Sequence, residues 1–389
     1  MNASICRPIA RSAAAINKRC IQARATNFIQ PGLEISTCLH SRPTHTVKAR
    51  GFTSSAQRSN KPLKSPAKFS EQHLPPPALL KTAYKSGALH LPPQQVLDFL
   101  QDFLYQSSMN NLGWQRRVCL EHNIDPATLG LIAGILEKSD SPAQLNFSAV
   151  LLGTAAKFGD RASIFKRVYE ANQIRKIHYV PEALAEVGLL AKNGNDPQAM
   201  TLLGIVLYTQ GKEQQALEWF RKATSGSLDF NGAANALVFQ GRILAPYDLE
   251  GARAAFARAA SELDDPAAFF HLSKLETPGS PAQEAYLTSA AASGVLEACH
   301  NLGVNELARI HDGGEQPRSL SDYGPAREWT QIAAEGGFGL SMLNMASMCM
   351  GVGLRGEAMA WLEKAIGRPD VKGEAEMLKA RWTESEIEE

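Results

Sequence analysis

The sequence predicts an all-α protein built from repeated helix–turn–helix units, and three observations support this fold class. From Ala78 onward, apolar residues recur at helical spacing: the run "QQVLDFLQDFLY" places one face of a helix at Val96, Leu97, Leu100, Phe103 and Leu104. No alternating strand pattern follows in the sequence. Gly and Pro separate apolar segments of about 10–15 residues, which is typical of short helices joined by tight turns.

An internal repeat is the strongest of these signals. The segment Ala199–Ala223 aligns without a gap on Ser341–Ala365, pairing Gly211 with Gly353, Ala216 with Ala358, Trp219 with Trp361, and Lys222 with Lys364. Weaker copies follow the same order, since Asn195–Gly204 matches Asp264–Ser273 and Ala252–Ala260 matches the end of the first segment. Asp196 and Asp265 each precede a proline, a pair that caps and begins a helix.

These residues resemble the Sel-one-like repeat family of tetratricopeptide-like proteins. The family pattern is matched by Ala199, Leu203, Gly204, Gly211, Ala216, Trp219, Lys222 and Ala223, and the resemblance covers about residues 183–380. It implies a right-handed α-solenoid with Trp219 buried against Leu203. The second and third copies lack the tryptophan, and Glu306–Ala326 is expected to form a longer loop between helices.

The order G-x-G-x-x-G occurs once, at Gly351, Gly353 and Gly356, and would suggest a nicotinamide enzyme. A dinucleotide loop requires a strand before the first glycine, and the preceding residues are Met-rich and helical in spacing. Gly353 also aligns with Gly211, whose repeat lacks the motif. The sequence therefore predicts a turn between two helices and no cofactor.

Other chemistry receives weaker support. A metal site formed by His271, His300 and Cys299 stays open as an alternative to packed histidines, and Asp264–Asp265 reads either as an acid–base pair or as a helix start. The methionines near Met345 are expected in the core, with a minority at a partner surface. The sequence contains no catalytic triad, P-loop or H-E-x-x-H motif. It therefore predicts neither an enzyme nor a metal site.

Charge divides the chain of 389 residues into two parts. Residues 1–68 hold 12 Lys/Arg and one acid, Glu34, while the remaining 28 basic and 38 acidic residues give a net charge of −10. The leader is amphipathic and rich in Arg and Ser, as mitochondrial transit peptides are, and "RGFTSS" places its processing near Thr53. A disordered basic tail that binds nucleic acid or acidic lipid is the alternative.

The predicted organisation has five parts. They are a presequence (1–53), a disordered Pro/Lys-rich linker (54–77), an N-terminal helical region that caps the solenoid (78–182), the repeat solenoid (183–380) and an acidic C-terminal tail (381–389). The predicted location is the mitochondrial matrix or the matrix face of the inner membrane, with a peripheral membrane contact left open.

The function expected from the repeat resemblance is a non-enzymatic mitochondrial adaptor that binds protein partners, with assembly of a respiratory complex as the favoured task. First-helix positions outside the packing stripe should line a concave groove. The candidates are Thr201, Ile205, Tyr208, Asn235, Phe239, Arg242, His300 and Val304. An RNA-binding repeat factor in mitochondrial gene expression is the alternative, which the negative charge of the body disfavours.

Overall fold

The computed structural model describes residues 71–109, 113–314 and 316–384. This part of the chain contains eighteen α-helices, three 3-10 helices and no strand. It forms two compact units, residues 71–219 and 220–384, whose boundary falls within α10 (Glu213–Ala223). The predicted all-α class is therefore confirmed, and none of the described helices is long and apolar enough to cross a membrane.

The first unit is built around an aromatic core. Phe99, Phe103 and Phe147 are fully buried, and the ring of Trp114 packs edge-on against Phe103 at 4.6 Å between centroids. The unit contains η1 (Glu71–His73), α2 (Pro77–Lys85), α3 (Pro93–Ser107), α4 (Trp114–Glu121), α5 (Pro126–Leu136), α6 (Pro142–Lys157), α7 (Arg161–Gln173), η2 (Ile177–Tyr179), α8 (Pro181–Asn193) and α9 (Pro197–Thr209).

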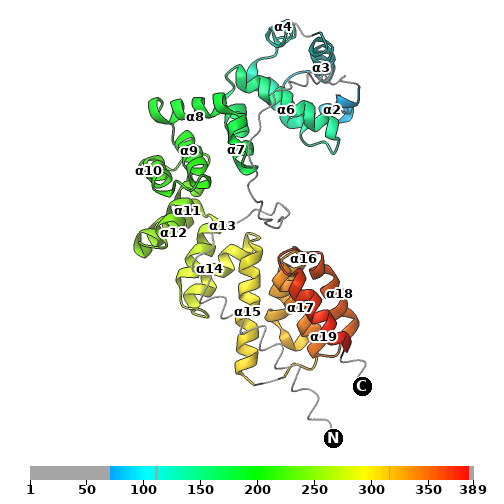
Figure 1. Cartoon of the computed structure of the whole chain (residues 1–389), viewed down its shortest axis with the longest axis vertical. Coiled ribbons are helices and arrows are strands. Elements are labelled where there is room, and N and C mark those ends of the chain that lie inside the picture. Colours follow the sequence, from blue (N-terminus) through cyan, green and yellow to red (C-terminus); the bar gives the residue numbers. More distant parts are fainter. Residues whose placement is uncertain (1–70, 110–112, 315, 385–389) are drawn as a thin grey trace, which may run out of the picture. The chain divides into compact units, whose positions relative to one another are not determined.

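The second unit is a series of helix pairs, of which α17 and α18 are seen side by side in Figure 1. Each helix packs on the next along the chain, so every pair buries its apolar face against its neighbours. The elements are α11 (Ala233–Leu244), α12 (Leu249–Leu263), α13 (Pro266–Leu275), α14 (Pro281–Ala292), α15 (Leu296–Asp312), η3 (Leu320–Tyr323), α16 (Pro325–Glu335), α17 (Gly339–Gly351), α18 (Arg355–Ile366) and α19 (Lys372–Glu384).

The second helices of these pairs share a buried stripe at positions i, i+4 and i+7. The stripe is formed by Ala252, Phe256 and Ala259 in α12, by Ala326, Thr330 and Ala333 in α16, and by Ala358, Leu362 and Ala365 in α18. The tryptophan of the repeat lies one residue before the middle residue of this stripe, as Trp361 precedes Leu362, and it is partly exposed to solvent. Trp219 is half-buried, whereas Phe220 is fully buried, which corrects the prediction that Trp219 is the core residue.

The glycine motif forms a turn, as predicted. Gly351 ends α17, Gly353 adopts a left-handed φ of +80°, and Gly356 lies inside α18. Gly211 has a φ of +76° at the matching position. A helix precedes this motif where a dinucleotide loop would need a strand, so the cofactor interpretation loses its structural basis.

The aspartates before proline cap helices, which confirms their structural interpretation. The side chain of Asp265 accepts from the Ala268 N–H at 2.8 Å, and Asp264 takes the left-handed position that ends α12. In the pair Asp264–Asp265, the first residue therefore ends α12 and the second begins α13.

Several predicted boundaries require correction, while residues 1–70 lie outside the described part of the chain. The end of the predicted linker is folded, because η1 begins at Glu71 and the Leu74 carbonyl accepts from Gln144 Nε2 at 2.8 Å. The boundary at 182 falls in the first turn of α8, and the first third of the expected loop Glu306–Ala326 continues α15, which ends at Asp312. The first residues of the tail predicted from 381 belong to the last turn of α19, where Trp382 is buried.

Candidate functional site

Four of the eight predicted groove residues are buried, which corrects their assignment to an open surface. They are Thr201, Ile205, His300 and Val304. The reason is that first helices have neighbours on more than one side: α9 packs on both α7 and α8, and α15 packs on both α14 and α16. A helix covered in this way buries more than a single stripe.

His300 is a packed core histidine. Its Nδ1 lies 2.8 Å from Ser341 Oγ, and its ring lies 4.9 Å from the ring of Phe338. Ser341 is fully buried and occupies the repeat position held by Ala199 in the first copy. The pair thus joins α15 to α17 by a buried polar contact, which a single sequence could not reveal.

The other four predicted residues keep access to solvent, and their binding role stays a prediction. Tyr208 is half-buried and belongs to the first unit. Asn235, Phe239 and Arg242 lie on α11 in the second unit, where Asn235 is exposed and the other two are half-buried.

Phe239 and Arg242 form the first part of a face on the second unit. The ring of Phe239 stacks on Phe220 with 5.6 Å between centroids and 11° between planes. The Arg242 guanidinium lies over the outer ring, with Cζ 5.2 Å from the Phe239 centroid. This stacking fixes the cation at the surface of α11, because the face of an aromatic ring attracts a positive charge.

The neighbouring helix α13 repeats the arrangement with residues that the sequence had not singled out. Lys274 Nζ lies 4.2 Å from the centroid of Phe270, and Phe270 is buried. The shared pattern is an aromatic residue followed three or four positions later by a cation, a spacing that puts both on one helix face. We call Phe239, Arg242, Phe270, His271 and Lys274 the α11–α13 face.

His271 stands at the inner side of this face. Its ring stacks on Phe256 at 4.8 Å and 9°, and its Nε2 is buried without a hydrogen-bond partner in the described part of the chain. Burial, assisted by the positive charges of Lys274 and Arg242, lowers the pKa of His271 to about 3. The imidazole is therefore neutral at physiological pH and cannot act there as an acid.

The two cations of the face affect one another. Burial is the main cause that lowers the pKa of Lys274, Glu297 on α15 opposes this shift, and Arg242 adds to it. Much of the Lys274 side chain stays exposed to solvent. The face thus offers two positive groups beside half-buried aromatic surface, a combination suited to binding carboxylates.

The thiols of the described residues are all inside the protein. Burial raises the pKa of Cys119 to about 11 and also raises the pKa of Cys299 and Cys349, so none is an activated thiolate. His271 and His300 have different partners, and no group of three or more His, Cys, Asp or Glu side chains within the described residues could hold a metal ion.

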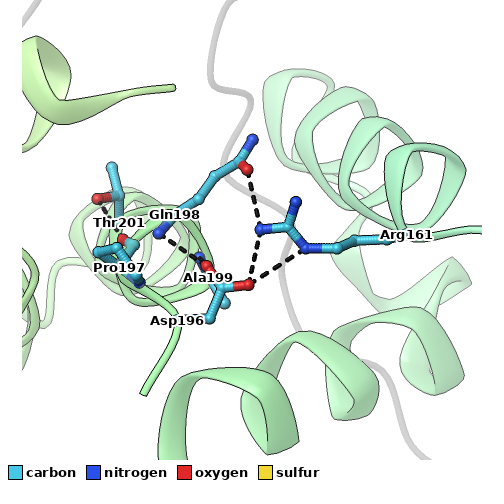
Figure 2. A network of polar contacts seen from close by, with 6 residues as sticks. All are labelled: Arg161, Asp196, Pro197, Gln198, Ala199 and Thr201. Atoms are coloured by element: carbon cyan, nitrogen blue, oxygen red, sulfur yellow. Dashed lines mark hydrogen bonds and ion pairs between the residues drawn. The ribbon is translucent and has the colours of Figure 1, made fainter. Parts of the chain in front are cut away.

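A second polar cluster, in the first unit, has a structural role (Figure 2). One oxygen of Asp196 caps α9 by accepting from the N–H groups of Gln198 and Ala199 at 3.0 and 3.1 Å, while the other accepts from Arg161 Nη2 at 2.6 Å. Arg161 Nη2 also donates to Gln198 Oε1 at 3.0 Å. The network therefore ties the start of α7 to the start of α9.

Comparison with known proteins gives only a distant likeness. No family model and no curated protein matches the chain. Among solved structures, a Sel1 repeat protein from Oxalobacter formigenes is similar at 18% identity, over 82% of this chain and 97% of that one, with a TM-score of 0.32.

Proposed function

We propose that this chain is a non-enzymatic protein-interaction scaffold whose α11–α13 face captures an acidic segment of a partner protein. The observation that carries the proposal is the pair of cations held over aromatic rings on neighbouring helices, Arg242 over Phe239 and Lys274 over Phe270. The two cationic side chains lose little conformational freedom on binding, because the rings beneath them already restrict their movement.

Electrostatics favours an anionic ligand at this face. Arg242 lowers the pKa of Lys274, which means that the two positive charges repel one another in the free protein. A carboxylate placed between them would relieve this repulsion. The half-buried ring of Phe239 adds apolar contact area beside the charges, so an acidic segment with a neighbouring apolar residue fits best.

The setting we propose is the mitochondrion, and the favoured task is assembly of a respiratory complex. The basic, acid-poor leader of residues 1–68 supports import into mitochondria. Peripheral contact with the inner membrane belongs to the same proposal. The acidic body disfavours RNA as the main ligand, since it provides no general basic surface for phosphates.

The proposal is tested by capturing partners of the tagged full chain from mitochondria and identifying them by mass spectrometry. The variants Arg242→Gln and Lys274→Gln should each lower the yield of the same partner without lowering the unfolding midpoint. Lys212→Gln is the matched control, because Lys212 is an exposed cation outside the face. Equal partner yield from all three variants would exclude this face, and recovery of RNA alone would favour the RNA alternative.

A further inference from the structure

Between α7 and α8 the chain presents a short exposed segment, "IRKIHY", residues 174–179, which combines apolar and basic side chains. Ile174 is 61% exposed and Tyr179 is 69% exposed, while Arg175, Lys176 and His178 are also exposed. Neither the Arg175 nor the Lys176 side chain has a hydrogen bond or ion pair with any residue that the structure describes. Large apolar groups and unpaired cations are thus offered to solvent together.

The backbone of this segment is held in place, so these side chains are presented on a fixed support. The N–H of Lys176 donates to the Ala171 carbonyl at 2.7 Å, and the N–H of Arg175 donates to the Asn172 carbonyl at 3.0 Å. The His178 and Tyr179 rings also lie 4.4 Å apart. A ligand would therefore meet a surface that is largely formed before binding.

Arg175 itself occupies an unfavourable backbone position. Its φ is +55°, the left-handed conformation that ends a helix, and every other described residue with positive φ is Gly, Asn or Asp. The turns that end α6 and α9 use Gly159 and Gly211 for this purpose. A long side chain is disfavoured there, and an outlier of this kind is a reason to look for a function of the side chain.

We infer that residues 174–179 dock on a membrane surface that carries anionic lipid. Tyrosine and aliphatic side chains favour the interfacial layer, and Arg and Lys are attracted by anionic headgroups. The apolar and the basic side chains of the segment can therefore both be bound by the same membrane surface. RNA would gain little from Ile174, which has no ring on which a base could stack.

This inference rests on the membrane contact included in the proposed function, and its test is independent of partner capture. The full chain is floated with vesicles of phosphatidylcholine, or of phosphatidylcholine mixed with an equal part of phosphatidylglycerol. Binding should require the anionic lipid, decrease with salt, and fall about fivefold for each of Arg175→Gly and Lys176→Gln. Arg175→Gly should also raise the thermal unfolding midpoint, since glycine suits the left-handed position.

Asn123→Gly is the matched control, because Asn123 is also exposed and left-handed but lies outside the segment. It should raise the thermal unfolding midpoint and leave vesicle binding unchanged.

Hydrogen exchange on the same samples locates the contact, and the amides of residues 173–179 should exchange more slowly with anionic vesicles present. Protection confined to the leader, vesicle binding unaffected by Arg175→Gly, or binding of a single-stranded RNA in place of vesicles would each overturn the inference. Loss of partner capture with intact vesicle binding would count only against the α11–α13 face.

Discussion

At the residue scale, the core of the repeats depends on the residue that follows each tryptophan. Phe220 is fully buried and stacks on Phe239, while Trp219 is half-buried. We expect Phe220→Ala to lower the free energy of unfolding by about 3–5 kcal/mol, as other large-to-small core changes do. Trp219→Ala should cost less, because more of its surface stays in water in the folded state.

Urea denaturation measures this difference, and a second copy of the repeat provides the control. Leu362 is fully buried and follows the half-buried Trp361, so Leu362→Ala should likewise cost more than Trp361→Ala. If the tryptophan changes prove the more destabilising in both copies, the assignment of the buried stripe is wrong.

His271 should make stability depend on pH. Its pKa falls from about 6.5 to about 3 on folding, so the unfolded chain binds the proton more readily. The stability that this residue contributes is present above pH 6.5 and is lost as the pH falls toward 3, by up to about 1.4 kcal/mol for each pH unit. Unfolding free energies measured between pH 7 and 5 should therefore fall less steeply for His271→Leu than for the unmodified chain. The exposed His178 serves as the comparison, and an equal change of slope in His178→Leu would argue against the buried imidazole as the cause.

Two glycines of the G-x-G-x-x-G motif should respond to alanine in opposite directions. Gly353 has a φ of +80°, which alanine adopts poorly, so Gly353→Ala should cost about 1 kcal/mol. Gly356 lies in α18 with no atom within 4 Å of an added Cβ and no positive φ, so Gly356→Ala should add about 0.5–1 kcal/mol. Thermal unfolding measures both, and an NAD(H) affinity lost in either variant would restore the cofactor interpretation.

At the scale of elements, the packing of α15 against α16 depends on Gly303. A Cβ at this position would meet Thr330 Oγ1, and it would lie 3.2 Å from the Thr330 nitrogen and 3.3 Å from the Ala326 carbonyl oxygen. Gly303→Ala should therefore destabilise the fold by about 1–3 kcal/mol, because backbone atoms cannot move aside without separating the helices.

Denaturant unfolding tests this packing, with a helical glycine in open space as the control. Gly134 in α5 has no atom within 4 Å of an added Cβ, so Gly134→Ala should stabilise its helix. Adding Thr330→Ala to Gly303→Ala should recover only part of the loss, because the backbone contacts remain. Full recovery would show that the hydroxyl alone limits the approach of the helices.

At the scale of the whole molecule, the cellular location of the chain is predicted independently of its fold. The acid-poor leader and the run "RGFTSS" predict import into mitochondria with processing near Thr53. N-terminal sequencing of the protein isolated from cells measures this directly. An intact Met1 on material from the cytosol would contradict both the address and the mitochondrial part of the proposed function, while leaving the α11–α13 face to be judged by partner capture.

The sequence alone determined the local features of this protein. Helical periodicity, the Asp-Pro starts at Asp196 and Asp265, and the left-handed turns at Gly211 and Gly353 depend only on residues close together in the chain. For this reason the all-α class and the reading of the glycine motif as a turn could be predicted correctly. Phe239 and Arg242 are half-buried on α11, their stacking was not foreseen, and their binding role stays a prediction.

Tertiary structure decided which faces of those helices are covered. Thr201 and His300 satisfy the pattern of an open groove position, yet both are buried by neighbouring helices. Phe220 replaces Trp219 in the core because Phe220 lies on the buried stripe at i, i+4 and i+7, whereas Trp219 lies beside it and is half-buried. His271 and Lys274 joined the α11–α13 face only when α13 packed beside α11. Burial is set by atoms distant in sequence, and the periodicity of one helix does not reveal how many sides its neighbours will cover.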